Sequence, residues 1–106
     1  MSTTTTRARP HYVPGALCPR CRRRHQSWRT VAQCRWKGAL WITGKPPAHK
    51  DAFAVVAWCH PGTTVTLWAS RQEAEQAKGR IDALACGGNC LGRFWHQLVV
   101  LPAEAA

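Results

Sequence analysis

The run FAVVAWCHPGTTVTLWASRQEAEQAK, residues 53–78, decides the fold of this chain. Phe53 to Cys59 is a short apolar segment of the length typical of a strand. His60-Pro61-Gly62 is a turn sequence. Thr63 to Ala69 alternates Thr with Val and Leu, as a half-buried strand does. The two segments therefore predict an antiparallel β-hairpin.

A helix is predicted directly after the hairpin. Ser70 is a favourable N-cap residue, and Glu73 stands at the position that completes a capping box. Gly87-Gly88 would end the helix. Its apolar side chains recur at helical spacing and form one face, which consists of Ala74, Ala77, Ile81, Leu84 and Ala85.

Three further elements are predicted on either side of this run. Ser27 caps a short helix that Gly38 ends. Ala39 to Thr43 is a short strand, which we expect to pair antiparallel with the strand at 53–59. Trp95 to Leu101 is a last strand. The first helix has an apolar stripe of Trp28, Val31, Ala32 and Trp36 and a polar stripe of Arg29, Gln33 and Lys37.

The order of these elements predicts an α+β fold, a small antiparallel sheet of three to four strands with two helices. We expect residues 1–17 to be a flexible basic arm, residues 18–101 a single small Cys-rich domain, and residues 102–106 a frayed tail. A domain of this size buries little surface, so a structural zinc ion would help to hold it.

Composition excludes several classes of protein. The 106 residues are 45% hydrophobic and include six Trp, which is too much apolar surface for a disordered chain. The longest apolar run, Ala52 to Cys59, is far shorter than the roughly 20 residues that span a bilayer. Residues 1–17 lack the apolar stretch of a secretory signal. We therefore expect a cytoplasmic protein without a membrane partner.

Basic residues are concentrated in the first half of the chain. The chain carries a formal net charge of +10, and none of its five acidic residues lies before Asp51. Such an excess favours a polyanionic partner, nucleic acid above all and DNA ahead of RNA. The alternative is a solvated face that only keeps the protein soluble. The residues predicted to contact phosphate are Arg7, Arg9, Arg20, Arg22, Arg23, Arg24, Arg29 and Lys37.

The six cysteines predict a structural zinc site. A helix that folds back on the strand at 63–69 returns Cys86 to the hairpin end of the sheet, beside Cys59. A strand at 39–43 paired with 53–59 would bring Cys34 to the same end. The preferred ligand set is therefore Cys34, Cys59, Cys86 and Cys90.

A second ligand set pairs Cys18 and Cys21 with Cys86 and Cys90. His25, His60 and His96 are substitute ligands for either set. Cys18, Cys21, His25 and Cys34 also form a loose CCHC spacing, with a long last gap. The competing interpretation is that Cys34 and Cys59 are packed thiols and that no metal is bound.

Other chemistry finds little support in the sequence. The sequence predicts no catalytic site of paired carboxylates, and it contains no phosphate-binding Gly-rich loop and no HExxH motif. We therefore expect that the protein is not an enzyme. The Cys18-Pro19-Arg20-Cys21 motif resembles the redox loop of thioredoxin-like proteins, which leaves a thiol redox protein as a minor alternative. A second alternative is an adaptor that docks on an acidic host protein.

Residues 31–101 resemble a group of small Cys-rich proteins from actinobacteria and their phages or mobile elements. The resemblance is carried by CGGNC at 86–90 and by the TVTLWASRQEAEQAKGRID run that ends at Asp82. No activity is attached to that group. The resemblance therefore implies an origin in a phage or mobile element and implies no mechanism.

Overall fold

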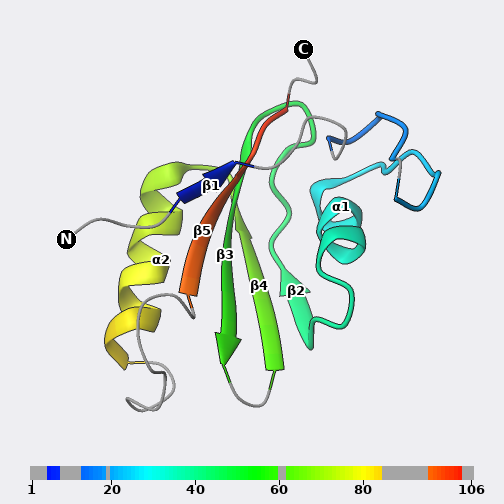
Figure 1. Cartoon of the computed structure of the whole chain (residues 1–106). Helices are drawn as coiled ribbons and strands as arrows, with labels where there is room; N and C mark the ends of the chain where they lie inside the picture. The colour runs from blue at the N-terminus through cyan, green and yellow to red at the C-terminus, as the bar shows by residue number, and fades with distance from the viewer. Residues whose placement is uncertain (1–4, 8–12, 19, 60–61, 85–95, 104–106) are drawn as a thin grey trace.

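A five-stranded mixed sheet organises the protein in the computed structural model (Figure 1), which describes residues 5–7, 13–18, 20–59, 62–84 and 96–103. The strand order is β1-β5-β3-β4-β2. Two helices complete the described fold, which confirms the predicted α+β class with two helices. The elements are β1 (Thr5–Arg7), α1 (Trp28–Arg35), β2 (Trp41–Thr43), β3 (Ala52–Cys59), β4 (Gly62–Trp68), α2 (Arg71–Leu84) and β5 (His96–Leu101).

The three long strands are antiparallel, as the sequence predicts. β3 and β4 form the expected hairpin, with Val56 opposite Val65. β5 returns on the other side of β3, with Val55 opposite Leu98. β3 is therefore the central strand, and both of its edges are paired.

The predicted pairing of residues 39–43 with β3 is wrong. β2 pairs instead with the outer edge of β4, and the pairing is parallel, with Ile42 opposite Val65. The reason is that β4 and β5 already occupy both edges of β3. Because β4 begins at the hairpin turn, the start of β2 nevertheless lies at the expected end of the sheet.

The segment predicted as a flexible arm contributes a strand. Thr5–Arg7 forms β1, which pairs in parallel with β5 at the edge opposite to β2. The arm has no hydrophobic periodicity because three residues at a sheet edge are too few to show any. The sheet is therefore larger than the predicted three to four strands, and its two outermost strands are parallel to their neighbours.

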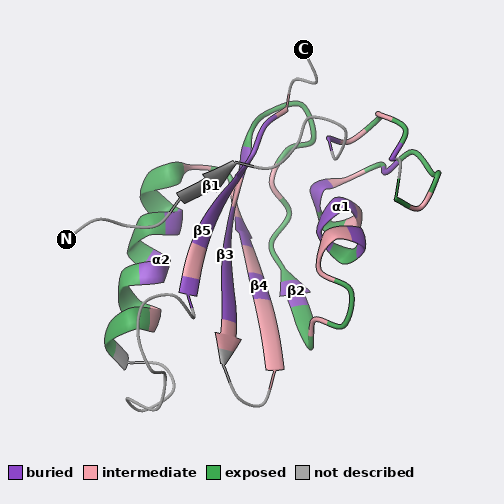
Figure 2. Ribbon diagram, viewed as in Figure 1, coloured by how far each residue is buried: buried purple, intermediate pink, exposed green. Residues whose placement is uncertain are grey.

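The two helices cover opposite faces of the sheet, as Figure 1 shows. On one face, Trp28 and Val31 of α1 pack with Val56 and Leu67. On the other face, Ala74 and Ala77 of α2 pack with Val55 and Leu98. Figure 2 shows the buried positions concentrated in β3 and β5 and on the inner side of each helix. Alternate residues of β3 thus supply both cores.

Both helices begin at the predicted caps. The Ser27 hydroxyl accepts from the backbone N–H of Thr30, and the Thr30 hydroxyl completes a capping box. The backbone N–H of Glu73 donates to the Ser70 hydroxyl over 3.1 Å. These caps fix where α1 and α2 start, and α1 carries one member of the site described next.

Candidate metal centre

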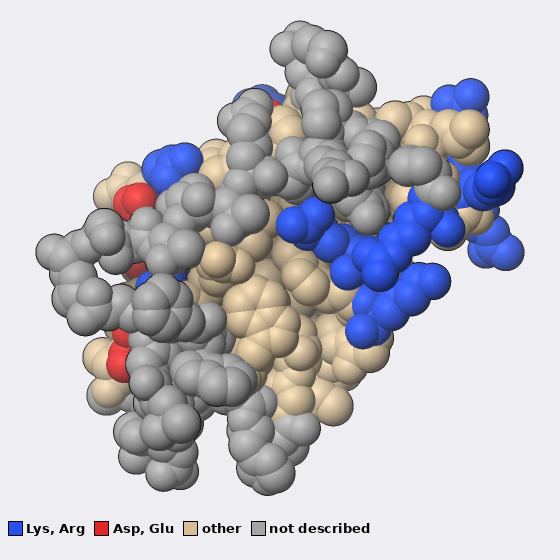
Figure 3. All heavy atoms as spheres, in the orientation of Figure 1, with Lys and Arg blue, Asp and Glu red and all other residues tan. Residues whose placement is uncertain are grey.

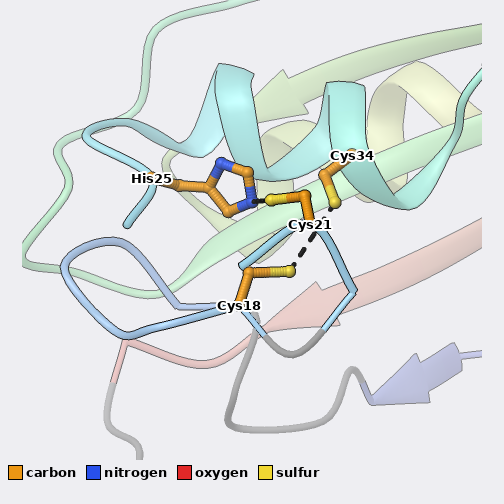
Figure 4. A group of neighbouring side chains, drawn as sticks. All are labelled: Cys18, Cys21, His25 and Cys34. Carbon is orange, nitrogen blue, oxygen red and sulfur yellow. Dashed lines mark hydrogen bonds between the residues drawn. The ribbon is translucent and has the colours of Figure 1, made fainter. Parts of the chain in front are cut away.

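Four side chains gather at the outer side of α1 and could hold a metal ion. They are Cys18, Cys21 and His25 from the segment before α1 and Cys34 from α1 itself, and their ligand atoms all lie within 4.8 Å of one another. Figure 4 shows the three thiols and the imidazole pointing toward one another. Thiolate sulfur and imidazole nitrogen together are a donor set for soft and borderline transition metals.

A tight backbone turn brings Cys18 and Cys21 together. The Arg22 N–H donates to the Cys18 carbonyl over 2.7 Å, and the Cys18 N–H donates to the Arg23 carbonyl over 2.9 Å. Leu17 and Arg24 close the turn with an antiparallel bridge. We call residues 17–25 the knuckle. Arg22 adopts a φ of 61°, a conformation that costs about 1 kcal/mol in a residue with a side chain.

The knuckle is fastened to α1 by the side chains of Cys18 and Arg20. The Sγ atoms of Cys18 and Cys34 lie 3.6 Å apart. Within the knuckle, Cys21 Sγ lies 3.4 Å from His25 Nε2. The guanidinium of Arg20 donates to the carbonyl of Arg35 over 3.3 Å. Cys18 is 0% exposed and His25 8%, so the cluster is largely shielded from water.

The environments of two thiols drive their pKa values in opposite directions. Burial would raise the pKa of Cys18, but hydrogen bonds from the Cys21 backbone, the His25 ring and the Arg20 backbone outweigh it and lower the pKa to about 6. Burial and the hydrogen bond to Cys18 raise the pKa of Cys34 to about 11. Of the two thiols in this contact, Cys18 is therefore the more acidic.

The structure assembles a different ligand set from the preferred one. Of the four preferred ligands, only Cys34 belongs to the cluster. Its partners are Cys18 and Cys21 of the second ligand set and the substitute ligand His25. The preferred set assumed that Cys34 faces the hairpin end of the sheet, whereas Cys34 contacts the knuckle. The four residues of the loose CCHC spacing are the ones that the structure brings together. The long gap between His25 and Cys34 is the length of chain needed to leave the knuckle and form most of α1.

The remaining predicted ligands are not brought into this cluster. Cys86, Cys90 and His60 lie outside the described residues, and Cys59 is described only through its backbone at the end of β3. The imidazole of His96 lies elsewhere, with Nδ1 2.7 Å from Asp82 Oδ1. A metal role for Cys59, Cys86 and Cys90 stays a prediction.

Six predicted phosphate-binding residues lie on the knuckle, on α1 or just after α1, the segments that carry the cluster. We call Arg20, Arg22, Arg23, Arg24, Arg29 and Lys37 the basic face, and all six are exposed. In Figure 3 most of the visible Lys and Arg atoms gather over α1 and the segment before it, whereas acidic atoms appear mainly over α2. Arg7 lies in β1, away from α1, and Arg9 lies outside the described residues.

One polar cluster, around Asp82, was not predicted from the sequence. Lys78 and His96 are 5% and 3% exposed, and both contact the Asp82 carboxylate. Lys78 follows Ala77 on the buried side of α2. A lysine at such a position needs an acidic partner, and this was the signal in the sequence that could have revealed the cluster. The cluster joins α2 to the start of β5 and lies on the opposite face of the sheet from the metal cluster.

No protein-family model, no curated protein and no solved structure matches this chain. The resemblance to actinobacterial and phage proteins therefore stays a prediction. Among the helices of the described segments, none is long and apolar enough to cross a membrane.

Proposed function

We propose that the protein is a non-enzymatic, zinc-stabilised nucleic-acid-binding protein of phage or mobile-element origin that acts in the cytoplasm. The observation that carries this proposal is the basic face, six exposed cations on and beside the segments that carry the Cys3His cluster. DNA is the expected polymer, ahead of RNA. The metal centre would hold the knuckle in place, and the basic face would contact phosphate.

Zinc suits the geometry of the cluster. In a tetrahedral site with Zn–S bonds near 2.3 Å and Zn–N bonds near 2.05 Å, two sulfurs are about 3.8 Å apart and a sulfur and a nitrogen about 3.5 Å. The corresponding separations here are 3.6 Å between Cys18 and Cys34 and 3.4 Å between Cys21 and His25. Four protein ligands and no open position are typical of a structural rather than a catalytic zinc site.

The basic face carries more positive charge than is needed to neutralise the metal centre. Zn²⁺ with three thiolates and a neutral imidazole carries one net negative charge, which a single arginine could balance. The basic face has six cations, and arginine binds phosphate oxygens through two parallel hydrogen bonds. Arg22 also keeps its side chain at a φ of 61°, where glycine would be less strained. The surplus charge supports an external polyanion.

The test measures affinity for labelled DNA duplex, single-stranded DNA and RNA of one sequence across a salt series. We expect Arg22→Gly to weaken binding and to reduce the slope of log Kd against log salt by about one. Glycine relieves the strained φ, so lost binding would not reflect a lost fold. Arg80→Ala, on the exposed side of α2, removes the same charge elsewhere and should change little. Absence of binding at low salt, or equal losses in both variants, would overturn the proposal.

A protein-binding adaptor is the second candidate, and exposed apolar side chains favour it. Leu40 and Trp41 are 55% and 48% exposed, and they lie together at the edge strand β2. An acidic host protein retained from nuclease-treated lysate by the wild type, but not by Trp41→Ala, would support the adaptor. Retention that disappears with nuclease would support nucleic acid.

The minor alternative, a thiol redox protein, finds less support at Cys18. A lowered thiol pKa suits an attacking thiolate, but such a sulfur must also be reachable by its substrate. Cys18 is 0% exposed. Cys18→Ser should therefore remove metal binding rather than a disulfide-exchange activity.

A further inference from the structure

An open pocket of about 500 Å³ lies between the knuckle and α1 and borders the metal cluster. Three of the four candidate metal ligands, Cys21, His25 and Cys34, contribute to its wall. The pocket is therefore formed by the segment that the cluster fastens to α1. Its volume falls in the range of about 300–1,000 Å³ that accommodates small ligands and exceeds the need of a lone phosphate.

The polar side chains of the pocket fall into two groups. Arg23, Arg24 and Lys37 are the cations, and none of the described residues that line the pocket is acidic. Gln26 and Gln33 supply side-chain amides, and both residues are exposed. The Thr30 hydroxyl also borders the pocket, but it is engaged in the capping box with Ser27 and is not available to a ligand.

These two groups match the two parts of a nucleotide. Arginine and lysine bind phosphate, and Arg24 is held in place by a 3.0 Å hydrogen bond to the Gly15 carbonyl. A glutamine amide carries a donor and an acceptor side by side, which complements the edge of a base. A phosphate ligand alone would not contact the two amides, and an uncharged base alone would not contact the three cations.

We propose that this pocket holds one nucleotide of a bound single strand, with its phosphate among Arg23, Arg24 and Lys37 and its base edge at Gln26 and Gln33. The inference rests on the proposed function and adds a strand preference to it. A base in a duplex is stacked and paired, so it enters such a pocket only after unstacking. Single-stranded nucleic acid therefore binds more tightly than duplex.

The experiment compares Gln33→Ala with Gln76→Ala, the same substitution at an exposed position of α2. The probes are single-stranded homopolymers of the four bases and one duplex, measured across a salt series at saturating zinc. We expect Gln33→Ala to weaken single-strand binding about five- to tenfold and to reduce the differences among the four homopolymers. The salt slope should not change, because the amide carries no charge. Lys37→Gln should instead reduce the slope by about one.

The outcomes separate this inference from the proposed function. If Arg22→Gly loses affinity while Gln33→Ala matches Gln76→Ala, the basic face binds nucleic acid and the pocket holds no nucleotide. Duplex binding as tight as single-strand binding would likewise overturn the pocket proposal. If neither polymer binds at low salt, both proposals fail.

Discussion

Replacement of Cys34 by alanine separates a metal ligand from a packed thiol. Cys34 is 6% exposed in α1, and its Sγ lies 3.6 Å from that of Cys18. Alanine has the highest helix propensity, so the substitution does not harm the helix itself. Any large loss of stability must therefore come from the missing sulfur.

The two interpretations predict different magnitudes. If Cys34 is only a small buried side chain, loss of its sulfur costs about 1 kcal/mol, a little more than one buried methylene group. Structural Zn²⁺ contributes about 10–16 kcal/mol in zinc-finger peptides. Shared evenly over four ligands, this gives a cost of about 2.5–4 kcal/mol for the loss of Cys34. The two interpretations therefore differ by about 1.5–3 kcal/mol in the free energy of unfolding, which is easily measured.

The assay is the free energy of unfolding in urea, measured with saturating zinc and again with a chelator. With zinc, we expect Cys34→Ala to be about 2.5–4 kcal/mol less stable than the wild type. With the chelator, we expect the difference to shrink to about 1 kcal/mol. The metal assignment would be refuted if wild type and Cys34→Ala differed equally in stability with zinc and with the chelator. It would also be refuted if the chelator did not change the stability of the wild type.

Metal content identifies the other ligands. Cys21→Ser should lose the ion of the described cluster, whereas Cys59→Ser should keep it, because Cys59 lies in β3 and not in the knuckle. If Cys59→Ser instead releases this ion, the assignment to the knuckle is wrong. A second ion per chain that leaves with Cys59→Ser would show that Cys59 also binds metal, as the sequence predicts.

Three further predictions concern the scaffold and are checked by urea unfolding. Gly44→Ala should lower the free energy of unfolding by about 2–3 kcal/mol, because φ is 100° and a Cβ would overlap the Leu67 carbonyl oxygen. Gly79→Ala should raise it by about 0.5–1 kcal/mol, because there is open space beside Gly79 and alanine favours the helix α2. Burial would raise the pKa of Asp82, but hydrogen bonds from Lys78 and His96 outweigh it and hold the pKa below its ordinary value. Asp82→Asn should therefore lower the free energy of unfolding by about 1 kcal/mol at pH 7, once solvent screening is allowed for. This loss should vanish as the pH falls through the pKa of Asp82 in the folded protein. Glu75→Gln is the control. Trp28→Phe should cost about 1 kcal/mol, because Nε1 donates to the carbonyls of Pro47 and Lys50 over 3.0 and 2.9 Å.

Local patterns predicted most of the fold. Ser27 and Ser70 mark the helix starts because a cap depends on residues within one turn. The hairpin at 53–69 was predictable because alternation and a turn sequence specify antiparallel neighbours. The position of β2 was not predictable in this way, since it depends on which sheet edges remain open after β5 has paired with β3.

The candidate site was predicted only in part, for a physical reason. Cys18, Cys21 and His25 lie close in sequence, so their association is a property of one short turn. The association of Cys34 with them depends on how α1 packs against the knuckle, which spacing alone does not reveal. The contact between Asp82 and His96 joins residues fourteen apart across a helix and a strand, and neither carries a local signal for it.

The shortness of the two outermost strands has a consequence for self-association. β1 and β2 have three residues each, and they cover the outer edges of the longer strands β5 and β4. A sheet edge templates growth into fibrils or chains when it offers a long, flat row of unpaired amides and carbonyls. Within the described residues, β1 and β2 each offer only a three-residue row. These two strands are therefore too short to template strand-to-strand polymerisation.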